Sequence, residues 1–225
     1  MAGHKTPRGK KNRNDRIQTL SPQLGYYLIV TDTKETEQSY FNGVRDSLPA
    51  EIQHTRRLVV HVSNTSTNKL VSVCKELYEY YPQYRNPWIV FDRDEVVDFD
   101  SIITNAQKES INVGWSNPCL EIWLHAYFGT MPAITTSWQC CDSFSKIYKR
   151  KTGQSYSKSA KDLYKKLITY GDEEKAIKIA HQKYKEHQTD GQRKKKPSEM
   201  YPCTTVYKLI NEINEKIRDY SKKNC

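Results

Sequence analysis

The chain has 225 residues, enough for one domain or for one α/β domain with a helical extension; 36% of its residues are hydrophobic, and 16 are tyrosines. Its formal net charge of +10 favours a polyanionic partner such as nucleic acid, although a merely basic surface would give the same count. No stretch approaches the ~20 apolar residues of a membrane span and no Cys-x-x-Cys pair occurs, which excludes a membrane protein and a usual zinc knuckle and favours a reduced, cytoplasmic protein with free thiols.

Short apolar runs alternate with segments of helical periodicity up to about residue 124. Residues 1–22 are polar and basic, and they form either a flexible arm that follows phosphates or a solvated tail. The first apolar run is too short for a signal peptide. The predicted strands cover residues 26–30, 57–62, 88–91 and, more weakly, 111–115. The predicted helices are 35–48, a segment with Leu70, Val73, Leu77 and Tyr80 on one face, 98–109, and a segment that contains 120–124.

From about Trp138 the pattern is helical, and it is interrupted by a basic loop near residues 193–196. Strands that alternate with helices at short spacing indicate an α/β fold. We therefore expect a mostly parallel sheet of about four strands flanked by helices, with a helical C-terminal annex. The expected organisation is a basic arm at 1–22, a sheet domain at 23–135, and a helical basic region at 136–225 that packs on it.

Acidic side chains follow two of the predicted strands. Asp32 comes after the first strand, with Glu37 close behind, and Asp92 and Asp94 come after the third. Ligands of open parallel sheets bind beyond the carboxyl ends of the strands, and Mg²⁺ or Mn²⁺ prefers oxygen ligands of this kind. Because alternate residues of a strand project to the same side, Asp92 and Asp94 are expected to point together. The other interpretation is that these residues form turns and helix caps.

A second polar group follows the fourth predicted strand. Ser116-Asn117-Pro118 and Glu121 form either an N-cap with an acidic first turn or a wall of the active site. His125 lies one turn after Glu121 on the same predicted face. The sequence has no Gly-x-Ser-x-Gly elbow and no Gly-rich phosphate loop, so a serine nucleophile and a nucleotide cradle find little support.

Basic residues gather in the C-terminal half, with tyrosines between them. Basic and aromatic side chains together suit backbone contact and base stacking, although a solvated helix face has the same composition. The residues assigned to nucleic-acid binding are Arg93, Asn117, Lys149, Arg150, Lys151, Lys158, Arg193, Lys194, Lys195 and Lys196.

Five segments together resemble the RloB family, which includes AbiLii-type abortive-infection proteins. They occur in family order and span nearly the whole chain. The segments are Leu28 to Phe41, Val90 to Glu95, Ser116 to Leu124, Tyr156-Ser157-Lys158, and Pro202 to Leu209.

The resemblance implies a Toprim-like fold in which Asp32, Asp92 and Asp94 bind Mg²⁺ for phosphoryl chemistry. It also matches Glu37 and Glu121 to family acids, and it implies an ATPase partner and a role as a toxin-like effector of phage defence. The chain departs from the family in two places. Asp32-Thr33 stands where the family has Glu-Gly, so Glu37 is an alternative to Asp32, and Tyr127 stands where the family has His.

We therefore expect Asp32, Glu37, Asp92, Asp94 and Glu121 to converge in one catalytic site, with a divalent cation held by Asp32, Glu37, Asp92 and Asp94. Repulsion between carboxylates this close predicts raised pKa values in the metal-free site. The expected function is a metal-dependent nuclease in phage defence, with RNA such as tRNA slightly favoured over DNA. The alternatives are a DNA nuclease with the same site and a non-catalytic, nucleic-acid-binding subunit of an ATPase complex.

Overall fold

The computed structural model describes residues 26–32, 35–50, 58–81, 84–94, 96–189 and 195–223, with the side chains of Tyr26 and Lys223 excepted. The basic arm at 1–22 and two residues assigned to nucleic-acid binding, Arg193 and Lys194, lie outside the described residues.

A five-stranded sheet in the order β2-β1-β3-β4-β5 forms the centre of the molecule. The first four strands are parallel and β5 pairs antiparallel with β4, so the expected α/β fold with a mostly parallel sheet is confirmed. The short β5 was not among the strands expected, because its two residues are too few for any periodicity to appear in the sequence. The strands are β1 (Tyr26–Thr31), β2 (Leu58–Val62), β3 (Tyr84–Asp92), β4 (Asn112–Asn117) and β5 (Cys203–Thr204).

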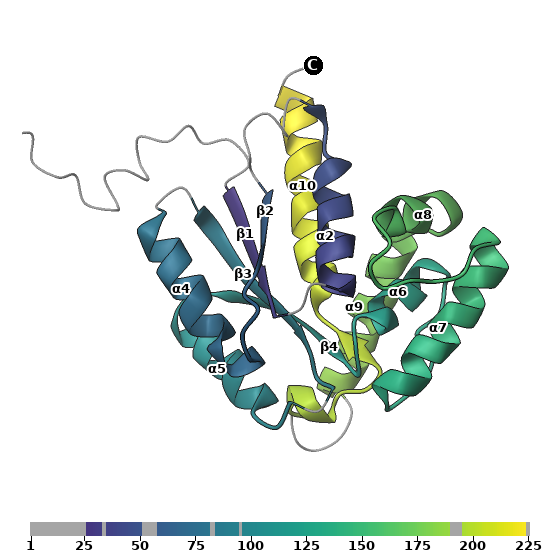
Figure 1. Cartoon of the computed structure of the whole chain (residues 1–225), viewed down its shortest axis with the longest axis horizontal. Coiled ribbons are helices and arrows are strands. Elements are labelled where there is room, and N and C mark those ends of the chain that lie inside the picture. The colour runs from purple at the N-terminus through teal and green to yellow at the C-terminus, as the bar shows by residue number, and fades with distance from the viewer. Residues whose placement is uncertain are drawn as a thin grey trace, which may run out of the picture.

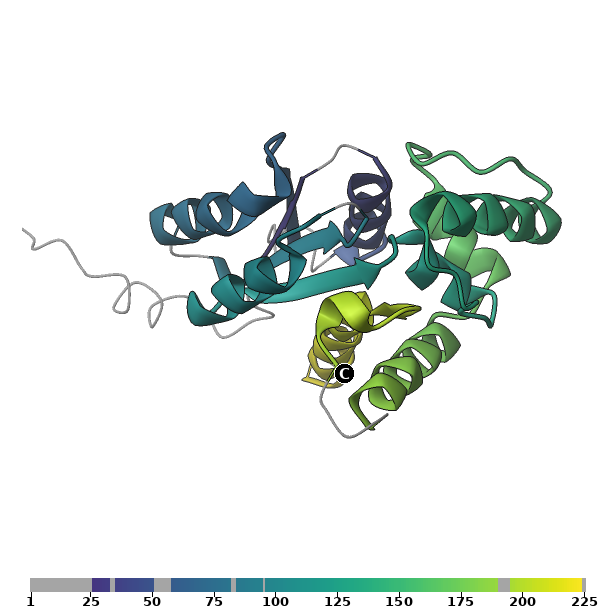
Figure 2. The same ribbon diagram turned by 90° about the horizontal axis from the view of Figure 1, so that it is seen from below.

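Helices α4 and α5 cover one face of the sheet, while α2 and α10 cover the other (Figure 1). Figure 2 shows α6 to α9, in green, as a group on one side of the strands. The helices are α2 (Thr36–Asp46), α4 (Leu70–Tyr80), α5 (Phe99–Lys108), α6 (Glu121–Tyr127), α7 (Ser137–Thr152), α8 (Leu163–Tyr170), α9 (Glu173–Thr189) and α10 (Val206–Lys223), with short 3₁₀ turns η1 (Thr67–Lys69) and η2 (Pro197–Glu199).

The apolar run of β1 is continuous because this strand is buried on both faces. Tyr27 and Ile29 face the core under α2 and α10, and Leu28 and Val30 face the core under α4 and α5. The prediction that Tyr80 lies on the buried face of α4 is wrong. Tyr80 is the last residue of the helix and is 78% exposed, and its ring lies against Tyr81, with 4.7 Å between the ring centroids.

The N-terminal and C-terminal halves of the chain share one hydrophobic core. Buried residues of β1 and α2 belong to the same cluster as buried residues of α7, α9 and α10. The Tyr27 hydroxyl of β1 donates to Glu212 Oε1 of α10 at 2.7 Å. The helical region is thus continuous with the sheet domain. It supplies β5 and also α10, which covers one face of the sheet together with α2. Within the described part of the chain, no helix combines the length and apolar character needed to cross a bilayer.

Candidate functional site

The carboxyl ends of β1, β3 and β4 lie at one edge of the sheet and carry the acidic residues. From β1 the chain continues to β2 on one side, while β3 lies on the other side of β1. Such a reversal opens a crevice between the two strands, where ligands of open α/β sheets bind. Asp32 follows β1 and Asp92 ends β3, so these two residues stand on either side of the crevice.

Four carboxyl groups lie near enough to one another there for their charges to interact. Burial raises the pKa of Asp92 well above its ordinary value, and the negative charges of Glu37, Glu121 and Asp32 raise it further. Glu37, in the first turn of α2, and Glu121, the first residue of α6, are 5% and 1% exposed. The helices that follow β1 and β4 therefore begin at the site and supply half of its carboxylates.

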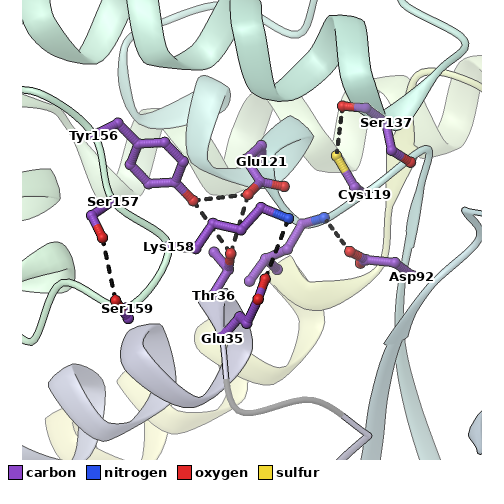
Figure 3. Close-up of polar contacts among 11 residues, drawn as sticks. Glu35, Thr36, Asp92, Cys119, Glu121, Ser137, Tyr156, Ser157, Lys158 and Ser159 are labelled. Carbon is purple, nitrogen blue, oxygen red and sulfur yellow. Dashed lines mark hydrogen bonds and ion pairs between the residues drawn. The ribbon is translucent and has the colours of Figure 1, made fainter.

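Two of these carboxylates are held by the loops beside the strands. The backbone N–H of Leu120 donates to Asp92 Oδ2 at 3.0 Å (Figure 3). The Thr67 hydroxyl donates to Asp32 Oδ2 at 2.5 Å. Sequence reasoning missed Thr67, for which the one signal was its position after a parallel strand.

Glu121 is fixed by two hydroxyl groups from distant parts of the chain. The Tyr156 hydroxyl donates to Glu121 Oε1 at 2.8 Å, and Thr36 Oγ1 donates to the same atom at 3.1 Å (Figure 3). These bonds orient a carboxylate that burial would otherwise disfavour. Tyr156 lies in the loop between α7 and α8, so the helical region completes the site.

The chemistry of the donor set suits a hard divalent cation, but no three of these four described carboxylates have their oxygens all within 4.8 Å of one another, so side chains would have to move to enclose one ion. Four carboxylates supply the oxygen ligands that Mg²⁺ and Mn²⁺ prefer. Asp92 Oδ1 is buried and has no hydrogen-bond partner among the described residues. A buried carboxylate oxygen without a partner is costly unless a cation or ordered water completes it.

Asp94 lies outside the strand that carries Asp92. β3 ends at Asp92, and the chain then turns, with Asp94 at φ 27° and its side chain exposed. The alternation that would point Asp92 and Asp94 to the same side applies only within a strand, so that inference was wrong. The backbone N–H of Asp94 donates to Pro118 O at 3.0 Å, which ties this turn to the loop before α6.

One cation borders the acidic site. Lys158 Nζ lies 3.6 Å from Glu35 Oε2, and the lysine side chain is 47% exposed (Figure 3). Burial alone would lower the pKa of Lys158, but the charges of Glu121 and its neighbours outweigh this and raise it. Lys158 therefore carries a permanent positive charge beside the carboxylates.

Two residues assigned to nucleic-acid binding have structural roles instead. Asn117 is 4% exposed, and its Nδ2 donates to Pro197 O and Ser198 O, which joins the end of β4 to η2. The Arg93 guanidinium donates to Val96 O at 2.7 Å and lies over the Phe99 ring, so it holds the turn after β3. Polar residues that follow strands were taken for ligand contacts, whereas these two close loops.

The remaining basic residues fall into two surface groups. Lys149, Arg150 and Lys151 are exposed at the end of α7. Lys195 and Lys196 line a groove of about 950 Å³ between α5, β4 and α9, together with Lys108 and Lys208. The groove contains none of the four carboxylates of the acidic site.

The comparisons with known proteins identify the family. The family model described as "RloB-like protein" matches residues 27–213, from β1 into α10. The chain belongs to the RloB-like family. Neither the curated proteins nor the solved structures contain a match to this chain.

The match to the RloB-like family covers all the elements that build the acidic site. At the position where the family resemblance places His, Tyr127 is 1% exposed, and its hydroxyl donates to Glu173 Oε2 at 2.6 Å. His125 lies on the same helix and is 2% exposed. Burial lowers its pKa to about 4, against the smaller opposite effects of a backbone contact with Cys140 and of the Glu121 charge. His125 is therefore neutral at physiological pH.

His125 is expected to make the protein less stable in acid. The pKa of His125 in the folded state is about 4, below its ordinary value of 6.5. Between these two pH values the unfolded chain binds a proton at His125 and the folded chain does not. The free energy of unfolding is unaffected by His125 above about pH 6.5 and decreases as the pH drops towards 4. At pH 4 the titration of His125 has lowered it by roughly 3 kcal/mol. Urea unfolding of the wild type and of His125→Phe between pH 7 and pH 4 measures the difference, since the variant lacks this titration.

The exposed His181 on α9 provides the control. His181→Gln should keep the acid sensitivity of the wild type. Equal pH profiles for the wild type and His125→Phe would show that His125 is not held neutral.

Proposed function

We propose that this chain is a metal-dependent phosphodiester nuclease, with Mg²⁺ or Mn²⁺ held by Asp32, Glu37 and Asp92 and with Glu121 beside it. The observation that supports it is the proximity of these carboxylates at the edge of the sheet, with a buried oxygen of Asp92 that lacks a partner among the described residues. A divalent cation bound there would screen phosphate charge and lower the pKa of a water molecule.

The chain's own residues would then position the substrate. Lys158 stands at the rim of the site and contacts a phosphate oxygen through its ammonium group. Glu121, which Tyr156 and Thr36 orient, accepts a proton from the attacking water. Burial and the negative charges of its carboxylate neighbours raise the pKa of Asp92, and a bound cation would oppose that rise.

A non-catalytic nucleic-acid-binding subunit is the weaker candidate. Neighbouring carboxylates repel phosphates unless a cation is bound, so a protein that only binds nucleic acid would gain nothing from them. The role in phage defence and the ATPase partner rest on the resemblance to the RloB-like family and belong to this proposal.

Structured RNA such as tRNA is the proposed substrate, ahead of DNA. A folded RNA can be held by separate positive patches and by exposed aromatic rings. Lys149, Arg150 and Lys151 provide one patch, and Trp138, at the other end of α7, is 77% exposed. The alternative is DNA cleavage at the same site, and a cleavage assay with both RNA and DNA substrates distinguishes the two.

We expect cleavage of nucleic acid that requires Mg²⁺ or Mn²⁺. The test incubates the purified chain with tRNA, single-stranded RNA, plasmid and single-stranded DNA, each with metal and with chelator. Metal-dependent cleavage of RNA supports the proposal, and cleavage of DNA alone favours the DNA alternative. Binding without cleavage, even with the ATPase partner present, would favour the non-catalytic subunit.

Lys158→Ala and Lys161→Ala provide a matched pair for this assay. Lys161 is an exposed lysine three residues further along the same loop. Lys158→Ala is expected to raise KM roughly tenfold, since a charge-assisted contact to phosphate contributes about 1.4 kcal/mol. Lys161→Ala should leave KM close to that of the wild type.

A further inference from the structure

Three cysteines meet beside the acidic site. Cys119 lies in the loop before α6, and Cys140 and Cys141 lie in the first turns of α7. The Cys119 thiol donates to Ser137 O at 3.9 Å (Figure 3), and its Sγ lies within 4.8 Å of Cys141 Sγ. Segments about twenty residues apart in the sequence therefore place their sulfur atoms together.

Cys119 Sγ, Cys141 Sγ and a carboxylate oxygen of Glu121 all lie within 4.8 Å of one another. In a tetrahedral zinc site with Zn–S distances of ~2.3 Å, neighbouring donor atoms are about 3.5–4 Å apart. Small side-chain rotations would bring the three donors to that spacing. Glu121 Oε1 accepts two hydrogen bonds, so its other oxygen is the one that can turn towards a cation.

We propose that Cys119, Cys141 and Glu121 bind Zn²⁺, with water in the fourth position. Zn²⁺ takes thiolate and carboxylate ligands together, whereas Mg²⁺ avoids sulfur. Cys141 is half-buried and gives the ion access from solvent, while Cys119 is 4% exposed. Binding converts both thiols to thiolates and releases their two protons to the buffer.

A bound Zn²⁺ would coordinate Glu121 and so remove this carboxylate from the acidic site. Glu121 is then shared by two metal sites that compete for it. The Mg²⁺ site has hard oxygen ligands, and the Zn²⁺ site has soft sulfur ligands. Zn²⁺ at the thiols is therefore an inhibitor of the Mg²⁺-dependent reaction. This consequence rests on the proposed function, whereas the binding of Zn²⁺ does not.

Titration of the reduced protein with Co²⁺, a spectroscopic stand-in for Zn²⁺, tests the site. We expect a thiolate-to-cobalt charge-transfer band that saturates at one equivalent and disappears when Zn²⁺ is added. Cys141→Ser and Cys119→Ser should weaken Co²⁺ binding by at least about tenfold. Cys74→Ser is the matched control, because it removes a buried thiol from the core on the other face of the sheet, and it should bind as the wild type does.

A measurement on the wild type avoids any folding defect of the variants. Zn²⁺ should slow alkylation of Cys141, mapped by mass spectrometry, while Mg²⁺ should not. The absence of a thiolate band, equal Co²⁺ binding by Cys141→Ser and the wild type, or alkylation that Zn²⁺ does not slow would each overturn the proposal. If the chain cleaves no nucleic acid, the proposed function fails while the cobalt and alkylation results still decide the zinc site.

Discussion

Asp92→Asn is expected to remove metal-dependent cleavage while the fold remains intact. The substitution keeps the size of the side chain and an oxygen that can accept from the Leu120 N–H, but it removes the charge that would bind the cation. The rate should fall by roughly 10²–10³-fold, the size of effect seen when one charge-stabilising group is lost. Calorimetry should show Mg²⁺ binding to the wild type and little or none to the variant.

The stability of this variant separates a site defect from a folding defect. Burial and three negative neighbours raise the pKa of Asp92, so its ionised form is unfavourable in the folded state. The neutral asparagine should therefore unfold at the same temperature as the metal-free wild type or above it. A lowered unfolding temperature would contradict this expectation.

Two other aspartates serve as controls for Asp92. Asp98 is exposed before α5 and has no side-chain capping bond, so Asp98→Asn should cleave at the wild-type rate. Asp94→Asn should have a much smaller effect than Asp92→Asn, because its side chain is exposed in the turn after β3. If Asp94→Asn proves as damaging as Asp92→Asn, the site extends to that turn, contrary to the geometry described above.

Glu173→Ala is expected to destabilise the protein by about 2–4 kcal/mol, because several buried donors lose one acceptor. The hydroxyls of Tyr127 and Tyr164 donate to Glu173 Oε2 at 2.6 and 3.0 Å. Asn214 Nδ2 donates to Glu173 Oε1 at 2.8 Å. Both tyrosines are almost fully buried, so no solvent replaces the lost partner.

The hydrogen bonds continue from Glu173 to the sheet domain. The hydroxyls of Tyr127 and Tyr40 lie 2.7 Å apart, and Trp123 Nε1 donates to the Tyr40 hydroxyl at 2.9 Å. The network thus connects α2 and α6 with α8, α9 and α10. Its loss should loosen the helical region against the sheet, and Tyr156 with it.

Urea unfolding of Glu173→Ala and of Glu174→Ala measures this effect. Glu174 is the next residue of α9 and is exposed, so its removal should change the free energy of unfolding by less than about 0.5 kcal/mol. Equal stability of the two variants would show that the network contributes little. A second unfolding transition in Glu173→Ala alone would show that the two halves had uncoupled.

The sequence by itself determined the four parallel strands, the helices that follow them and the acidic ends of two strands. The runs around Ile29 and Val90 are apolar throughout because both faces of a central parallel strand are buried, and this is a local signal. Asp32 and Asp92 were recognisable because each follows such a run. The helices that carry Glu37 and Glu121 in their first turns were likewise predictable from the local sequence pattern.

Only the tertiary structure decided which of these residues meet. Strand order brings the ends of β1 and β3 together, and pairing across the sheet leaves no trace in a single segment. The chain turns after Asp92 and so takes Asp94 out of the strand, while Asn117 closes a loop. The Cys119–Cys141 cluster and the bonds to Glu173 join residues from separate elements. Such contacts depend on packing between distant segments, which periodicity and spacing along the chain do not encode.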